Sequence, residues 1–370
     1  MADRSKIEWT DASWNPIRAR NTATGKVGWH CERATTGCAG CYAEAFNRRL
    51  GTGLPFKPGH LDSGDVELFL DERMLLQPLR WTRPRTIFVC SMTDLFGRFV
   101  KDEWLDKIFA VTALTPQHDY QIVTKRSDRM RVYLTKDWTY ESIYNAMGRL
   151  GSVGATESHP YRTAFPNGRP WPLPNIWLGV SAERQDEANA RIPDLLATPA
   201  AVRFVSAEPL LGPIDLTRPV YHGEAGISMR GFLRDAAEPD DFRYHTTKLD
   251  WVIVGGESGR NARPMHPDWA RSLRDQCQAA DAAFFFKQWG EWAPNIGAID
   301  GWTIVDDPEI SKFAHREWED GRWSDEFWPM WCDFEDGNYD ETQCVSRVGK
   351  RVAGRLLDGV EHNAMPERDR

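Results

Sequence analysis

The chain has 370 residues, of which 41% are hydrophobic and 27% charged, and its formal net charge is −8. This composition fits a globular protein with one large domain, or one large domain and an appendage, and it excludes a mainly disordered chain. No apolar run reaches the roughly 18 residues of a membrane-spanning helix, and the first residues lack the apolar core of a secretory signal. We therefore expect a cytoplasmic protein with no membrane partner. Since an acidic chain repels polyanions, a nucleic-acid partner would need a local basic groove.

Short apolar segments rich in β-branched residues recur along the chain, and each ends in small polar residues. They lie at 86–94, 120–126, 175–183, 202–208, 249–258 and 282–290, and a shorter one lies at 6–10. Helical spacing follows three of them, at 101–115, 186–198 and 266–281. This alternation predicts right-handed βαβ units and an α/β fold with a parallel sheet, either open or closed into a barrel.

The connections between these segments are uneven. Residues 134–173 and 217–247 show no clear periodicity, so we expect insertions there that cap or gate the barrel mouth. The strand and helix alternation stops near residue 292. We therefore expect a barrel over 1–292 and a C-terminal extension over 293–370, whose last part forms a hairpin, or a strand and a helix, packed on the barrel.

Polar residues and glycines cluster where the predicted strands end. In α/β barrels the carboxyl ends of the strands form the rim of the active site, so these residues predict a common site. The candidates are Ser91, Thr93, Asp94, Lys125, Ser181, Glu183, Ser206, Glu208, Gly255, Gly256 and Glu257.

Three of the seven cysteines, Cys31, Cys38 and Cys41, lie within eleven residues, just before a segment that can form a helix. In a reducing compartment this density indicates metal ligation rather than disulfides. The spacing alone leaves two centres open. A structural zinc would take a fourth ligand, such as His30 or Cys90. A [4Fe–4S] cluster held by three cysteines would instead leave one iron open to a small molecule. The position of the loop between a first strand and a βα pattern favours the cluster.

Long sequence blocks support the cluster independently. They read SKIEWTDASWNP, GCAGCYAE, PLRW, FVCSMTDLF, TKRSDRM, LPNIWLGVS, RFVSAEPLLGPIDL, DWVIVGGESG, ARPMHPDWARSLRDQCQAA, FFFKQWGEW and VAGRLLDG. On these blocks the chain resembles the phage- and prophage-encoded three-cysteine proteins of the radical S-adenosylmethionine (SAM) superfamily, which are related to spore photoproduct lyases. The stretch between Pro16 and Cys31 is longer than in that pattern, and the C-x6-C-x2-C spacing departs from the commonest C-x3-C-x2-C.

The resemblance implies a partial (β/α) barrel of about six parallel strands, with a [4Fe–4S] cluster in the loop after the first strand and SAM bound at its open iron. It also implies that an electron donor such as a flavodoxin or ferredoxin reduces the cluster. By the same resemblance, Asp94, near Ser91 and Thr93, would accept a bond from the methionyl ammonium of SAM, and Lys125 would pair with its carboxylate. Ribose contacts would come from Ser181, Glu183, Ser206 and Glu208, and close approach to the adenine or substrate from Gly255, Gly256 and Glu257.

The substrate expected by this resemblance is a nucleoside, a nucleotide or a nucleic-acid base, with a peptide or small metabolite as the enzymatic alternative. A different class of function stays open on the residues alone. The basic stretch 125–131 and the aromatic side chains would suit a zinc-stabilised nucleic-acid-binding protein without catalysis.

Overall fold

The computed structural model describes residues 5–136, 138–151, 172–217, 220–221, 228–229, 248–294, 315–319, 322–323 and 344–367. The contacts divide the chain into two compact units. Unit 1 is formed mainly by Met1–Ser181 and also contains Asn189–Ser206, and unit 2 contains Ala182–Ala188, Ala207–Asp241 and Trp251–Arg370. The expected boundary at residue 292 stays a prediction.

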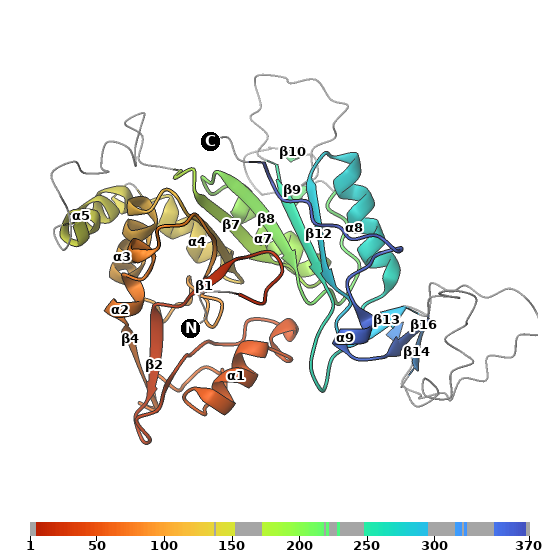
Figure 1. Cartoon of the computed structure of the whole chain (residues 1–370), viewed down its shortest axis with the longest axis horizontal. Coiled ribbons are helices and arrows are strands. Elements are labelled where there is room, and N and C mark those ends of the chain that lie inside the picture. Colours follow the sequence, from red (N-terminus) through yellow and green to blue (C-terminus); the bar gives the residue numbers. More distant parts are fainter. Residues whose placement is uncertain are drawn as a thin grey trace, which may run out of the picture. The chain divides into compact units, whose positions relative to one another are not determined.

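The parallel sheet predicted from the sequence is present, and it is curled and open (Figure 1). Its order is β1-β5-β6-β7-β8-β11-β12, which gives seven strands rather than the expected six. The strands are β1 (Ala12–Trp14), β5 (Thr86–Val89), β6 (Asp119–Thr124), β7 (Ile176–Ser181), β8 (Val202–Ala207), β11 (Trp251–Gly255) and β12 (Ala283–Gln288). Parallel strands that alternate with helices in this way form the βαβ pattern of a partial barrel.

The expected first strand at 6–10 is wrong, because residues 5–10 contain no strand and the sheet begins at β1 instead. Ala12 and Trp14 of β1 are fully buried and pair with Ile87 and Val89 of β5. The Trp14 indole donates a hydrogen bond to the carbonyl of Met74 at 2.7 Å. Burial of these side chains therefore fixes the register of a strand of three residues.

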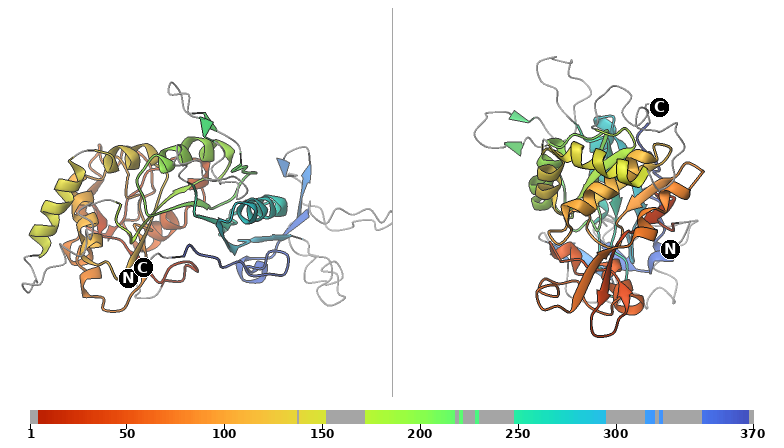
Figure 2. Two further views of the ribbon diagram at one scale, coloured as in Figure 1. Left: turned by 90° about the horizontal axis from the view of Figure 1, so that it is seen from above. Right: turned by 90° about the vertical axis from the view of Figure 1, so that its left-hand side faces the viewer.

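In unit 1, three helices pack beside the parallel strands, and the first of them lies in the segment 101–115 where the sequence predicts a helix. They are α3 (Asp102–Leu114), α4 (Ser127–Leu134) and α5 (Thr139–Gly151), and α5 packs along α3 (Figure 2). Asp102 and Glu103 lie in the first turn of α3, where carboxylates are favoured by the helix dipole. Helix α5 lies inside the segment 134–173 that was expected to be an irregular insertion, so part of that segment is regular structure.

A small antiparallel sheet explains the unusually long stretch between Pro16 and Cys31. Its strands are β2 (Ile17–Asn21), β3 (Val27–Gly28) and β4 (Val66–Leu70), in the order β3-β2-β4. The side chain of Asn21 accepts hydrogen bonds from the N–H groups of Ala23 and Thr24 and so closes the β2–β3 turn, where Gly25 has φ +70°. The extra residues thus form a hairpin that leads into the cysteine loop.

In unit 2, β11 and β12 are joined by α8 (Pro267–Ala279), which begins with proline as the first helical residue. Helix α7 (Gln185–Leu196) spans the unit boundary in sequence. The C-terminal part forms an antiparallel sheet, β13-β16-β14-β15, of Trp292–Pro294, Cys344–Arg347, His315–Glu319 and Arg322–Trp323, followed by α9 (Lys350–Ala353). The short strands β9 (Val220–Tyr221) and β10 (Ser228–Met229) also belong to unit 2, whereas the short helix α2 (Glu72–Leu75) belongs to unit 1.

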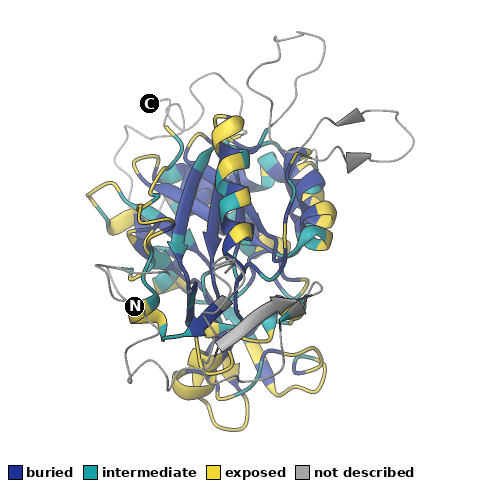
Figure 3. Ribbon diagram, turned by 90° about the vertical axis from the view of Figure 1, so that its right-hand side faces the viewer, coloured by how far each residue is buried: buried dark blue, intermediate teal, exposed yellow. Residues whose placement is uncertain are grey.

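The core lies along the parallel strands, which are buried, while the outward faces of the helices are exposed (Figure 3). All six residues of β7 and all five of β11 are buried. Strands buried on both faces read as continuous apolar runs, which is why the sequence revealed them. No helix among the described residues is long and apolar enough to cross a bilayer.

Most of the predicted insertion at 217–247 and of the extension at 293–370 lies outside the described residues, including Cys332 and the acidic, tryptophan-rich segment. The described pieces of the extension nevertheless pair with the end of the β11–α8–β12 unit. The Trp289 indole donates to the carbonyl of Leu356 at 2.8 Å, and its backbone N–H donates to Gly354 at 3.2 Å.

Candidate active site

The three predicted thiols lie in one loop of unit 1, between β3 and helix α1 (Tyr42–Leu50). Cys31 and Cys41 pack against an apolar cluster of Trp29, Ala43 and others. The thiols are close enough that Cys38 and Cys41 raise the pKa of Cys31 electrostatically. The loop therefore places the three thiols within electrostatic range of one another, and their ligation of a common metal centre stays a prediction.

The thiols differ in how readily they ionise. Burial raises the pKa of Cys31 to about 12, with a further contribution from Asp94. Burial also raises the pKa of Cys41. For Cys38, burial opposes ionisation, but Lys125 and the backbone N–H groups of Thr35 and Ala34 outweigh it and lower the pKa. Cys38 thus most easily adopts the thiolate form that binds metal.

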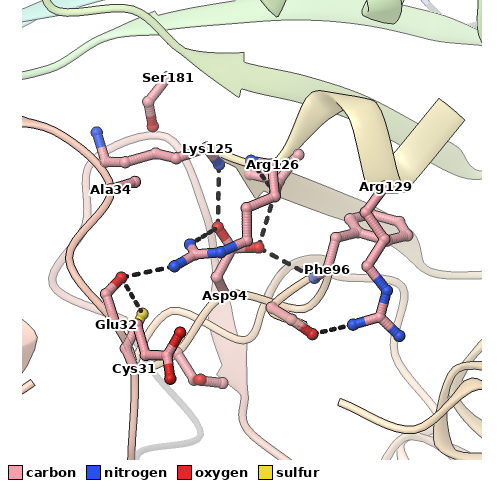
Figure 4. Close-up of polar contacts among 12 residues, drawn as sticks. Cys31, Glu32, Ala34, Asp94, Phe96, Lys125, Arg126, Arg129 and Ser181 are labelled. Atoms are coloured by element: carbon pink, nitrogen blue, oxygen red, sulfur yellow. Dashed lines mark hydrogen bonds and ion pairs between the residues drawn. The ribbon is translucent and has the colours of Figure 1, made fainter. Parts of the chain in front are cut away.

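Residues that follow β5 and β6 hold the cysteine loop in place (Figure 4). The Thr93 hydroxyl donates to the carbonyl of His30 at 2.5 Å, and Arg126 donates to the carbonyl of Glu32 at 2.6 Å. Beyond the loop, the Tyr42 hydroxyl donates to the carbonyl of Ser91 at 2.6 Å. Three hydrogen bonds therefore attach the peptide on both sides of the thiols to strand ends of the parallel sheet.

Asp94 is the centre of this arrangement. Its carboxylate accepts hydrogen bonds from the N–H groups of Phe96 and Lys125, both at 3.0 Å, and from the Thr124 hydroxyl at 2.7 Å. It also forms an ion pair with Arg126 at 2.9 Å, in which both side chains are largely buried. These four partners belong to the protein, so the visible role of Asp94 is to orient Arg126. Its expected contact with an ammonium of SAM stays a prediction.

Lys125 and Ser181 come from neighbouring strands, and Figure 4 shows both side chains on the same side of the cysteine loop. Burial lowers the pKa of Lys125 to about 8, against the opposing effect of Cys38. Ser206 lies opposite Ser181 in the register of β7 and β8, and both are buried. Lys125, Ser181 and Ser206 therefore lie at the carboxyl ends of neighbouring strands, as the sequence predicts.

The remaining candidates belong to unit 2. Glu183 is fully buried, and Glu208 pairs with Lys287 at 2.7 Å. Glu257 is held by Arg263 through three bonds of 2.7–2.8 Å, including one from the backbone N–H. These contacts give Glu208 and Glu257 partners within the protein, and their expected contacts with a cofactor or substrate stay predictions.

The two glycines of unit 2 are needed for close packing within the protein. A Cβ on Gly256 would lie 1.8 Å from the carbonyl oxygen of Trp289, which is backbone and cannot give way. A Cβ on Gly255 would lie 2.8 Å from a carboxylate oxygen of Glu208. The packing of Gly256 against β12 therefore accounts for this glycine without a ligand.

The basic stretch 125–131 is bound by the protein's own groups. Arg126 pairs with Asp94, Arg129 pairs with Asp102 at 3.0 Å, and Arg131 pairs with Asp194 at 2.8 Å. Arg129 also donates to the carbonyls of Gly97 and Val100. The stretch is thus the start of α4 fixed to neighbouring elements, and it gives no support to a phosphate-binding surface.

The two residues that could complete a zinc site, His30 and Cys90, are both buried. The buried His30 ring packs against Phe99 and His60, and burial lowers its pKa to about 4. Cys90 is buried behind β5 with its pKa raised, first by burial. Among the described residues, no three His, Cys, Asp or Glu side chains are placed to hold one metal ion. Thiolates around a cubane bind different irons and need not meet at one point.

The donor set suits a cluster with one open iron. Three thiols come from one loop, and the Cys38 sulfur accepts a hydrogen bond from the N–H of Ala34 at 3.4 Å. Ala39 and Gly40, between two of the thiols, are exposed, so the loop has room beside it. Sequence reasoning missed Arg126 as an anchor of this loop, since its partners Asp94 and Glu32 are 32 and 94 residues away.

The fold and the loop define an α/β protein in which a curled parallel sheet presents a three-cysteine loop at the ends of its strands. The chain belongs to the family described as "Protein of unknown function (DUF5131)", whose model matches residues 4–366. Searches of curated proteins and of solved structures give no match. The family description assigns no activity, so the function must be argued from the site.

Proposed function

We propose that this protein is a radical SAM enzyme of the cytoplasm that holds a [4Fe–4S] cluster through Cys31, Cys38 and Cys41 and acts on a nucleoside or a nucleic-acid base. The observation that carries the proposal is the three-thiol loop bonded to the carboxyl ends of β5 and β6 by Thr93 and Arg126. When bound, the cluster and SAM would supply a 5′-deoxyadenosyl radical that abstracts hydrogen from the substrate. The sequence resemblance to phage- and prophage-encoded proteins supports the same class.

The protein's own contribution is to hold the reactants and to exclude water. Cys38 is the thiol whose pKa is lowered, so it would ligate readily. Lys125 lies on the thiol side of β6, close enough to affect Cys38 and Cys41 electrostatically, and would pair with the carboxylate of SAM. Ser181 and Ser206, adjacent on β7 and β8, would offer hydroxyls to the ribose.

The substrate class rests on the resemblance rather than on a basic surface, because the arginines of 125–131 are paired internally. A base or a nucleoside is therefore favoured over recognition of a long polyanion by this stretch. The zinc-stabilised nucleic-acid-binding alternative relied on this stretch and on aromatic side chains, and the internal ion pairs argue against the first of these two features.

Binding of SAM beside the cluster should change the electron paramagnetic resonance spectrum of the reduced, reconstituted protein. Replacing Lys125 by Ala should raise the SAM concentration that half-saturates this change by about 10- to 100-fold, because a hydrogen bond to a charged group contributes about 1.5–3 kcal/mol. The measurement is a SAM titration of the spectrum.

The control for this titration is Arg20→Ala, which removes an exposed side chain paired with Glu67. It should titrate like the wild type. A reduced cluster whose spectrum is unaffected by saturating SAM would contradict an open iron. An unchanged titration in Lys125→Ala would remove Lys125 from the cofactor site.

A further inference from the structure

Helix α1 (Figure 1) begins directly after Cys41. It carries an exposed apolar stripe. Tyr42, Phe46 and Leu50 are spaced by four residues, so they lie on one face of the helix. Their exposed fractions are 58%, 39% and 61%. Contiguous apolar surface of this kind is unusual on a free protein surface and commonly marks an interaction site.

Arginines surround the stripe. Arg49 lies over the Phe46 ring at 6.0 Å, and Phe46 packs beside Trp29, whose other neighbour is Arg18 at 4.7 Å from the ring. The buried Trp29 thus supports Phe46 from beneath, and Arg49 borders the stripe at the surface. An apolar centre with a charged rim is the usual anatomy of a protein–protein interface.

The rim is positive although the chain is acidic. Arg48 and Arg49 are exposed on α1, and Arg33 pairs with Glu44 of the same helix, in a protein whose net charge is −8. On α1 itself, Glu44 is shared by Arg33 and Arg48, at 2.9 Å and 2.6 Å, so it neutralises only one of them. The surface therefore complements an acidic partner.

The stripe is also close to the proposed cluster. Helix α1 rises about 1.5 Å per residue, so its exposed side chains begin within one turn of Cys41 and end about 12 Å further along the axis. Aliphatic Leu50 and half-exposed Val27, with an exposed fraction of 39%, suit a folded protein partner better than stacked bases.

We propose that the surface formed by Tyr42, Phe46, Arg49 and Leu50 is the docking site of an acidic one-electron donor protein of the flavodoxin class. This inference rests on the proposed function. In the step it serves, the flavin hydroquinone of the donor loses one electron and becomes the semiquinone, and the oxidised cluster gains that electron. The residues act by docking, and the surface does not contact the substrate.

The test uses the reconstituted full chain with an acidic flavodoxin as the probe. The double variant Arg49→Glu, Leu50→Ser reverses one rim charge and replaces one apolar side chain by a polar one, both at exposed positions. Stopped-flow bleaching of the cluster by flavodoxin hydroquinone should slow by about tenfold or more, since charge complementarity acts mainly on association. Calorimetric binding of oxidised flavodoxin, with no reductant, should weaken in parallel.

The matched control is the double variant Arg351→Glu, Val352→Ser on α9. It changes an exposed arginine and an exposed apolar side chain in the same way and leaves α1 intact. It should react with flavodoxin like the wild type. Reduction by dithionite should be equal in all three proteins. If the wild type shows no cluster that dithionite can reduce, the proposed function fails. If dithionite reduces the cluster normally, the flavodoxin experiment tests the docking site alone.

Equal flavodoxin rates in the wild type and the Arg49, Leu50 variant would overturn the docking site. So would a wild-type cluster that dithionite reduces and flavodoxin does not. An oligonucleotide that binds the wild type, blocks flavodoxin, and loses affinity in the same variant would reassign the surface to nucleic acid.

Discussion

Replacing Cys38 by Ala should leave anaerobically reconstituted protein with little iron, whereas the wild type should carry about four irons per chain. The same loss is expected for Cys31→Ala and Cys41→Ala. Each thiolate would bind a different iron, and a cubane with two open irons is expected to be unstable. Iron and acid-labile sulfide, measured together with the absorbance of the cluster, check this expectation.

Cys277→Ala is the matched control for these variants. Cys277 is a buried thiol of α8 in unit 2, and no other thiol contributes to its raised pKa, whereas Cys38 and Cys41 both contribute to that of Cys31. Its replacement should leave the iron content unchanged. A full complement of iron in any of the three loop variants would remove that cysteine from the ligand set.

Replacing Asp94 by Ala should destabilise the protein by about 3–5 kcal/mol, because it leaves Arg126 as a buried charge without its partner. Both side chains are largely buried, and the carboxylate also accepts bonds from Thr124 and two backbone N–H groups. Release of Arg126 should also loosen the Glu32 carbonyl, so reconstitution should yield less cluster. Urea unfolding and iron content are the measurements.

Arg20→Ala breaks an exposed ion pair with Glu67 of similar length, 2.8 Å, and should cost no more than about 1 kcal/mol. The contrast between the two variants separates a buried anchor from a surface pair. If Asp94→Ala unfolds like the wild type and keeps its cluster, but binds SAM poorly, then Asp94 accepts the ammonium of SAM and is not the anchor of the loop.

The parallel sheet could be predicted because each of its longer strands is buried on both faces. The runs around Ile253 and Leu178 are apolar whichever way a side chain points, and such runs are visible in a single sequence. Strand β1 was misplaced because three residues give no periodicity, and its position depends on pairing with β5. The β2–β3 hairpin was missed for a related reason, since its strands alternate polar and apolar residues over only a few positions.

The grouping of several candidate residues in unit 1 could also be predicted, but the contacts of their side chains could not. Strand ends and cysteine spacing are local features, so Thr93, Lys125 and the thiols were found together. Partners are set by the tertiary fold. Thr93 bonds to His30, 63 residues away, and nothing local to Thr93 distinguishes that contact from a bond to a cofactor. Arg129 and Arg131 likewise suggested a phosphate-binding patch, because their ion pairs with Asp102 and Asp194 cannot be read from the sequence.

The most direct test of the central claim is a count of 5′-deoxyadenosine and methionine after the reconstituted, dithionite-reduced protein is incubated with SAM under strict anaerobiosis. The account predicts slow formation of both products in equal amounts, even without substrate, and their absence in Cys38→Ala. A verified reduced cluster that leaves SAM intact, or a protein that retains a single zinc and no iron, would contradict it.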